Sequence, residues 1–94
     1  MVDLLAPVRQ SIAMGRYLDT YHSEARSFER GITRGEILYV LNNGWHEKNK
    51  DRFDHLHESW CYAVRGKTLD ARELRVVVSF EQDNLLIVTA MDLD

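Results

Sequence analysis

The chain has 94 residues, of which 45% are apolar, and a single cysteine. This length supports one compact domain over residues 1–94 and is too short for two, and one cysteine excludes a disulfide framework. Lys and Arg number 12 against 15 Asp and Glu, a net charge of −3, which excludes a globally cationic nucleic-acid binder. Any contact with RNA must therefore come from a local patch.

The first part of the sequence has the apolar spacing and the terminating residues of helices. Apolar residues recur at spacings of three and four from Leu5 to Ile12 and predict a helix that ends at Gly15. A short extended link follows. A second helix is predicted from about His22 to Arg30.

The third predicted helix has the clearest local signal. Thr33 and Glu36 have the spacing of a capping box, in which each side chain accepts a hydrogen bond from a backbone N–H of the first turn. Ile37 and Leu41 then mark an apolar stripe, and Gly44 ends the helix.

In the second half the apolar period changes to two. Strands are predicted over residues 60–66, 73–80 and 85–91, the last apolar on both faces and therefore central. A weak edge strand is expected at 45–48, followed by an exposed loop to residue 58. Helices followed by strands predict an α+β fold, with N-terminal helices packed on one face of a small antiparallel sheet, a meander of three to four strands.

One polar stripe has the residue types of phosphodiester chemistry. His22, Arg26 and Arg30 recur every four residues and so line one face of the second helix. An imidazole can act as general acid or base while guanidiniums hold a phosphate. The alternative is a solvated helix face, with Glu24 and Glu29 available as ion-pair partners.

The pair His55 and His57 could begin a zinc site on a strand, completed by Asp51, Glu58 or Cys61. The chain has no second cluster with metal-ligand spacing. Neither a metal nor another cofactor is therefore predicted.

Three further side-chain types call for an interpretation. Cys61 lies in a strand with no histidine placed to activate it, which favours a packed thiol. Thr89 interrupts an apolar strand, so its hydroxyl needs either a backbone partner or a role in a site. Trp45 and Trp60 have no Lys/Arg cluster around them in the sequence and are expected to cover the sheet.

The sequence resembles a small bacterial family of unknown function, family 4258, over about residues 17–91. The segments that carry the resemblance are 22–33, 36–37, 43–44, 60–66, 74–78 and 88–90. The family is similar to the barnase/EndoU/colicin/RelE-like group, whose members include metal-independent ribonucleases and ribosome-linked toxins. The resemblance implies a polar site of His22, Arg26 and Arg30, faced by Thr89 from the last strand.

Two functions remain open from the sequence. One is a toxin-like, metal-independent endoribonuclease or RNA-interacting domain; the other is a non-catalytic interaction module in which the His/Arg stripe is structural. The expected partners are RNA, a cognate protein or a second copy of the chain at an exposed sheet edge. The sequence lacks a signal-peptide pattern and a long apolar run, which predicts a cytoplasmic protein without membrane contact.

Overall fold

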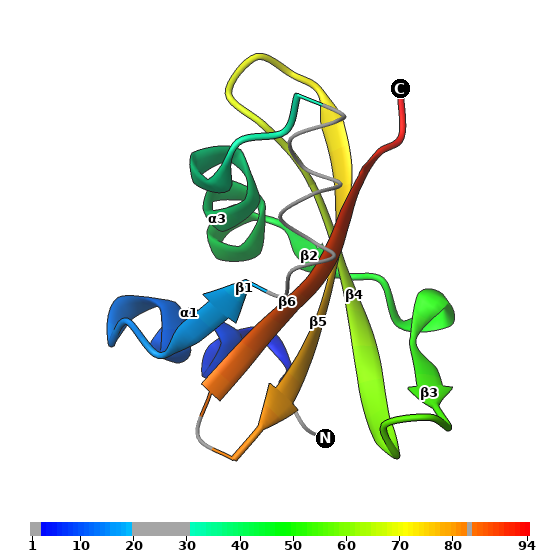
Figure 1. Ribbon diagram of the computed structural model, residues 1–94. Helices are drawn as coiled ribbons and strands as arrows, with labels where there is room; N and C mark the ends of the chain where they lie inside the picture. The colour runs from blue at the N-terminus through cyan, green and yellow to red at the C-terminus, as the bar shows by residue number, and fades with distance from the viewer. Residues whose placement is uncertain (1–2, 20–30, 83) are drawn as a thin grey trace.

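Helices form one layer and a mixed sheet forms the other in the computed structural model, which describes residues 3–19, 31–82 and 84–94 (Figure 1). The elements in chain order are α1 (Leu5–Ala13), β1 (Tyr17–Asp19), α3 (Arg34–Asn43), β2 (Trp45–His46), the 3-10 helix η1 (Lys48–Lys50), β3 (Arg52–Asp54), β4 (Ser59–Lys67), β5 (Glu73–Glu81) and β6 (Asn84–Asp92). The second predicted helix, residues 22–30, lies outside the described residues.

The sheet has six strands in the order β1-β6-β5-β4-β2, with β3 also paired to β4. The predicted meander is confirmed, because β4, β5 and β6 are antiparallel neighbours. The strand count is higher than predicted: β1 adds to β6 in parallel, and β2 and β3 both add to the outer edge of β4. The segment expected to be an exposed loop therefore supplies η1 and the strand β3.

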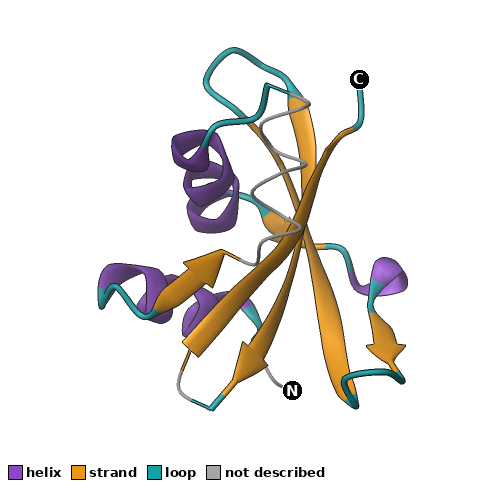
Figure 2. Cartoon of the chain, viewed as in Figure 1, coloured by secondary structure: helices purple, strands orange, loops and turns teal. Residues whose placement is uncertain are grey.

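Both described helices lie on one face of the sheet, whereas η1 and β3 lie on the other side (Figure 2). This confirms the predicted α+β arrangement. The most deeply buried side chains come from α1, α3 and the three long strands: Val8, Val40, Leu41, Val64, Leu74, Val76, Val78, Leu85, Ile87 and Ala90, all 0% exposed. Their burial supplies the main driving force for folding. None of the described helices is long and apolar enough to cross a membrane.

The capping box of α3 forms as predicted. The Thr33 hydroxyl accepts from the Glu36 backbone N–H at 3.1 Å, and the Glu36 carboxylate accepts from the Thr33 N–H at 2.9 Å. Two N–H groups of the first turn are thereby satisfied. The other end is held by Arg9 of α1, which donates to the carbonyls of Leu41 (3.2 Å) and Gly44 (3.0 Å).

A bulge in β6 determines which side chains of the last strand face the core. Val78 pairs with Ile87 but Val77 pairs with Thr89, so Val88 is an extra residue in β6. An extra residue shifts the alternation by one. Ala90 therefore joins the core with Ile87, although strict alternation places it on the opposite face.

Gly44 allows a close backbone contact between the end of α3 and the sheet. A Cβ atom at Gly44 would lie 2.4 Å from the Arg65 carbonyl oxygen and 2.7 Å from that of Val40. Gly66 of β4 lies on the other side of the contact, where a Cβ would be 3.0 Å from the Gly44 Cα. Side chains at these positions would force the end of α3 away from β4.

We expect Gly44→Ala to lower the free energy of unfolding by about 2 kcal/mol or more, because the added methyl meets backbone atoms that cannot rotate away. For a domain of this size, thermal denaturation followed by circular dichroism should show a melting temperature lower by roughly 10 °C.

Gly35→Ala is the matched control for this substitution. Gly35 lies in α3, and a Cβ there meets only the Thr33 hydroxyl, at 3.9 Å. Alanine should raise the melting temperature slightly, because glycine costs about 1 kcal/mol relative to alanine inside a helix. Equal melting temperatures for the two variants would contradict the proposed role of Gly44.

Candidate functional site

Three of the four predicted site residues, His22, Arg26 and Arg30, lie outside the described residues. Their common face and their role in phosphate chemistry stay predictions. Thr89 is described and lies in β6 opposite Val77, on the sheet face that α1 and α3 leave uncovered.

The Thr89 hydroxyl oxygen is buried and has no hydrogen-bond partner among the residues that the structure describes. A buried hydroxyl without a partner is unusual and costs about 1–3 kcal/mol. Of the two outcomes that the sequence leaves open, a backbone hydrogen bond is not found within the described part of the chain.

The same uncovered face contains a cavity of about 660 Å³. Its floor is made by Cys61 of β4, Ser79 of β5 and Leu86 of β6, and its rim includes Asp54 at the end of β3 and His57 from the turn between β3 and β4. A volume of this size is typical of small-ligand sites. Sequence reasoning missed this site because its walls come from four strands that only the sheet brings together.

A fixed imidazole stands at the rim of this cavity. His57 Nδ1 lies 2.7 Å from Asp54 Oδ2, and the other oxygen of Asp54 accepts from the backbone N–H groups of Leu56 (3.0 Å) and His57 (3.3 Å). The hydrogen bond from His57, opposed by partial burial, holds the pKa of Asp54 below its ordinary value. The carboxylate is therefore ionised and accepts, which places the imidazole proton on Nδ1 and leaves Nε2 as an acceptor when the ring is neutral.

The Cys61 thiol is 6% exposed, which confirms the prediction of a packed side chain. Burial raises its pKa, and the negative charge of Asp54 raises it further. The thiol is therefore neutral at physiological pH and is no nucleophile in this state.

The predicted His55/His57 pair lies in the turn after β3 and not on a strand. The His55 ring packs edge-on against Phe53 with a centroid distance of 5.1 Å, whereas His57 pairs with Asp54. Within residues 3–19, 31–82 and 84–94, no group of three or more His, Cys, Asp or Glu side chains could hold a metal ion.

Two aromatic side chains are exposed at the outer edge of β4, contrary to the expectation that the tryptophans cover the sheet. Trp60 is 51% exposed and Phe53, its direct partner across β3 and β4, is 38% exposed, with ring centroids 5.7 Å apart. Lys48 and Lys50 of η1 and Arg52 of β3 are exposed and have no ion pair with any other described residue. Pairing of β3 with β4 places Phe53 opposite Trp60 and Arg52 opposite Cys61, so the rings lie on one face of this edge and Arg52 on the other.

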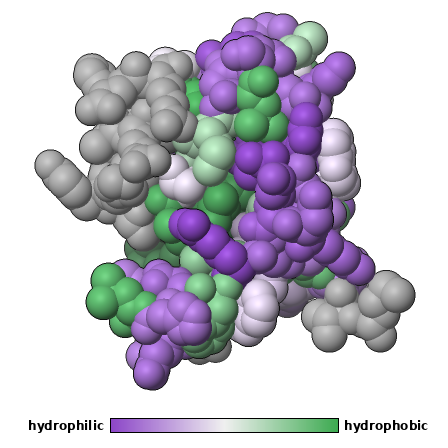
Figure 3. Space-filling model, turned by 90° about the vertical axis from the view of Figure 1, so that its right-hand side faces the viewer, coloured by the Kyte–Doolittle hydropathy of each residue, from purple (hydrophilic) through white to green (hydrophobic). Residues whose placement is uncertain are grey.

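These exposed groups lie on the side of the molecule that carries η1 and β3. Hydrophilic side chains cover much of that side, with hydrophobic side chains visible in smaller areas between them (Figure 3). We call Lys48, Lys50, Arg52, Phe53 and Trp60 the aromatic–cationic edge.

Two carboxylates anchor the chain segment that builds this edge. Glu47 accepts from Arg75 Nε at 2.6 Å and from Arg65 Nη1 at 3.0 Å, and its side chain is 10% exposed. Asp51 accepts from His46 at 2.7 Å and from the Ala63 backbone N–H at 3.0 Å. Glu47 and Asp51 thus hold the segment on the sheet.

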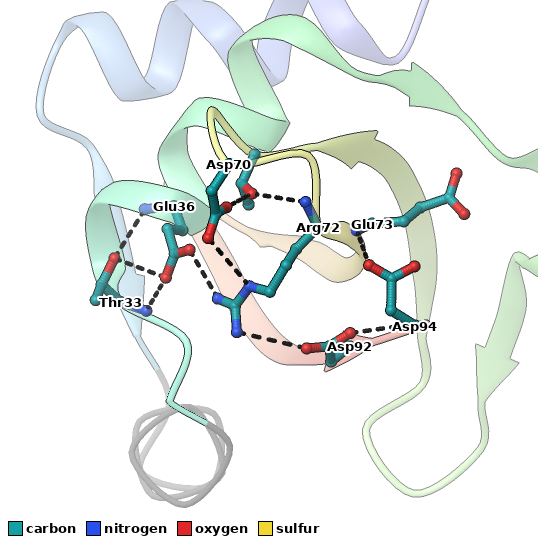
Figure 4. A network of polar contacts seen from close by, with 8 residues as sticks. Thr33, Glu36, Asp70, Arg72, Glu73, Asp92 and Asp94 are labelled. Carbon is teal, nitrogen blue, oxygen red and sulfur yellow. Dashed lines mark hydrogen bonds and ion pairs between the residues drawn. The ribbon is translucent and has the colours of Figure 1, made fainter.

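A separate polar network joins α3 to the C-terminal strand (Figure 4). Arg72, in the loop after β4, lies 2.7 Å from the Glu36 carboxylate and 3.4 Å from that of Asp92. The capping hydrogen bond from the Thr33 backbone and the bonds from Arg72 lower the pKa of Glu36 despite its partial burial. Because carboxylates from α3 and β6 hold the Arg72 guanidinium between them, we interpret the network as structural, although Arg72 Nε is buried without a hydrogen-bond partner among the described residues.

The chain belongs to the family described as Domain of unknown function (DUF4258), which matches residues 20–92. The resemblance noted in the sequence is therefore confirmed at the level of the family. No curated protein and no solved structure matches the chain.

The Glu47 anchor predicts a pH dependence of stability. Hydrogen bonds from Arg75 and Arg65 hold the pKa of Glu47 below its ordinary value, although burial opposes them. A lowered folded-state pKa contributes stability above the unfolded pKa of about 4.3, and this contribution is lost as the pH falls through the folded value. Glu47→Gln should cost about 1.5 kcal/mol at pH 7, and its deficit relative to the wild type should shrink between pH 5 and pH 3.

Thermal melts of both proteins across this pH range measure the deficit. Glu58→Gln is the control, because Glu58 is exposed and has no ion pair with the described residues. A Glu47→Gln deficit that stays constant down to pH 3 would show that its charge contributes nothing.

Proposed function

We propose that this protein is an RNA-directed domain that binds single-stranded RNA along the aromatic–cationic edge and cleaves it without a metal ion. The observation that supports the proposal most directly is the exposed Phe53–Trp60 pair, together with three exposed cations in η1 and β3 that lack ion-pair partners among the described residues. The described part of this edge accounts for binding. The predicted His22, Arg26 and Arg30 set accounts for cleavage.

Single-stranded RNA presents unstacked bases and a row of phosphates. Exposed aromatic rings accept bases by stacking, worth about 1–3 kcal/mol per base, and lysine or arginine neutralises phosphates. Phe53 and Trp60 provide the rings and Lys48, Lys50 and Arg52 the charges. Glu47, Asp51 and Asp54, the carboxylates of the same segment, are engaged with Arg75, His46 and His57. Their engagement leaves Lys48, Lys50 and Arg52 as the charged side chains of residues 47–54 that have no ion-pair partner among the described residues.

Cleavage needs a base, a proton donor and a group that holds the phosphate. In the proposed reaction His22 removes the proton of a ribose 2′-hydroxyl, whose oxygen then attacks the adjacent phosphorus. The bond from phosphorus to the 5′-oxygen breaks, a proton returns to that oxygen, and a 2′,3′-cyclic phosphate remains. Arg26 and Arg30 stabilise the charge that develops on the phosphate oxygens.

Thr89 enters the proposal through its buried, unpartnered hydroxyl. This hydroxyl can donate a hydrogen bond to a phosphate oxygen once a bound substrate has gained access to it. The barnase/RelE-like relationship belongs to this proposal as an analogy of fold.

The first prediction concerns binding. We expect the triple variant Lys48→Ala/Lys50→Ala/Arg52→Ala to bind a labelled RNA of eight uridines (U8) at least tenfold more weakly than the wild type does. The wild-type plot of log K against log salt should have a slope of about −2, since each phosphate contact on a single strand contributes about −0.7. Fluorescence anisotropy at several salt concentrations measures both quantities. Arg16→Ala, which removes one exposed cation after α1, is the control for loss of a positive charge elsewhere and should leave the affinity near that of the wild type.

For cleavage, His22→Ala should abolish the conversion of U8-containing RNA to cyclic-phosphate products in EDTA, while its affinity for the RNA stays unchanged. Equal activity in both proteins, or none in either, would contradict the catalytic role. The other outcome is that the wild type binds RNA without cleaving it and that Arg26→Ala melts several degrees lower. This result would support the alternative function, a non-catalytic interaction module in which His22, Arg26 and Arg30 stabilise the fold.

A further inference from the structure

The rings of the aromatic–cationic edge and its strand cation lie on opposite faces of β3. Phe53 pairs with Trp60, whereas Arg52 pairs with Cys61, which lines the cavity on the sheet face that α1 and α3 leave uncovered. Successive side chains of a strand point to opposite faces. A base that stacks on Phe53 or Trp60 therefore has its phosphate near a face to which β3 contributes no cation.

A third ring, the imidazole of His55, lies on the same side as these two rings. His55 follows Phe53 by two residues, and the two rings meet edge-on with their centroids 5.1 Å apart. Phe53 thus contacts both His55 and Trp60. His55 is exposed, and its side chain has no hydrogen bond or ion pair with any other described residue. Within the described part of the chain, nothing engages its ring nitrogens.

The other charged side chains of this turn leave His55 as the titratable group of the ring side. Asp54 and His57 bind each other at 2.7 Å at the rim of the cavity, on the face opposite the rings. Glu58 is exposed and has no ion pair with the described residues. Of the three rings, His55 is the one that gains a positive charge as the pH falls from 8 to 5.

A protonated imidazole supplies the cation that the ring side lacks. Both of its nitrogens then carry a proton, and either can donate a charge-assisted hydrogen bond to a phosphate oxygen. We propose that His55 binds RNA together with the aromatic–cationic edge, adding one phosphate contact when it is protonated, so that RNA binds more tightly as the pH falls. This proposal rests on the RNA-directed function proposed above.

The test measures the affinity for U8 with 2′-O-methyl riboses at pH 8.0 and at pH 5.5, by anisotropy of a label that is insensitive to pH. This RNA lacks the hydroxyl that attacks phosphorus in the proposed cleavage, and it carries no group that titrates between the two pH values. We expect the wild type to bind about fivefold more tightly at pH 5.5. The slope of log K against log salt should become more negative by about 0.7, the contribution of one phosphate contact on a single strand.

Two substitutions at His55 separate its charge from its presence. His55→Gln cannot be charged, so the gain in affinity at pH 5.5 should be lost. His55→Arg is charged at both pH values, so it should bind at pH 8.0 about as tightly as the wild type binds at pH 5.5.

His57→Gln is the matched control, because it makes the same change in the same turn but on the cavity side. It should keep the fivefold gain at pH 5.5. Circular dichroism melts at both pH values confirm that each variant is folded.

The outcomes separate the two proposals. Equal wild-type affinity at the two pH values, or a gain that persists in His55→Gln, overturns the role of His55 and leaves RNA binding at the edge intact. Binding of neither this RNA nor unmodified U8 at either pH overturns the RNA-directed function, and the role of His55 falls with it.

Discussion

The close contact of Gly44 with β4 determines where the rest of the chain runs. Because neither Gly44 nor Gly66 has a side chain, the end of α3 reaches the Arg65 carbonyl, and the chain leaves the helix directly along the edge of β4. From there β2, η1 and β3 follow that one edge. A side chain at Gly44 would lift the helix end and move this whole segment, including the rim of the cavity.

The carboxylates of the segment then hold it in place by bonding to the sheet. Glu47 bridges Arg65 and Arg75 on neighbouring strands, and Asp51 binds the Ala63 backbone. Charge-assisted hydrogen bonds of this kind are stronger than neutral ones, so a short, polar segment with little apolar surface can still have a defined path. The same pairing removes the carboxylates from competition with the neighbouring cations. The protein therefore has cations along this edge that are unpaired among the described residues, although its net charge is negative.

Local signals in the sequence predicted most of the fold. The capping box at Thr33, the helical spacing from Leu5 and the period of two in the long strands depend on neighbours in the chain, and each is confirmed. Two features were missed because they depend on pairing. The strand β3 is too short and polar to have a pattern of its own, and the bulge at Val88 is visible only against β5. The same holds for the candidate site. The sequence identified Thr89 as a single hydroxyl in an apolar strand, but it did not identify the residues that line the cavity, because they come from several strands.

By itself, the sequence determined a one-domain α+β protein with an acidic net charge, the family to which it belongs and the elements that local periodicity and capping specify. Only the tertiary structure decided that Phe53 and Trp60 are exposed partners, that Asp54 fixes His57, and that Glu81 shares a cavity with Ser79 and Leu86. The physical reason is that hydrophobic period and capping act within about a turn of helix or a strand. A cavity, in contrast, is made by side chains from several strands whose register is set by the packed core.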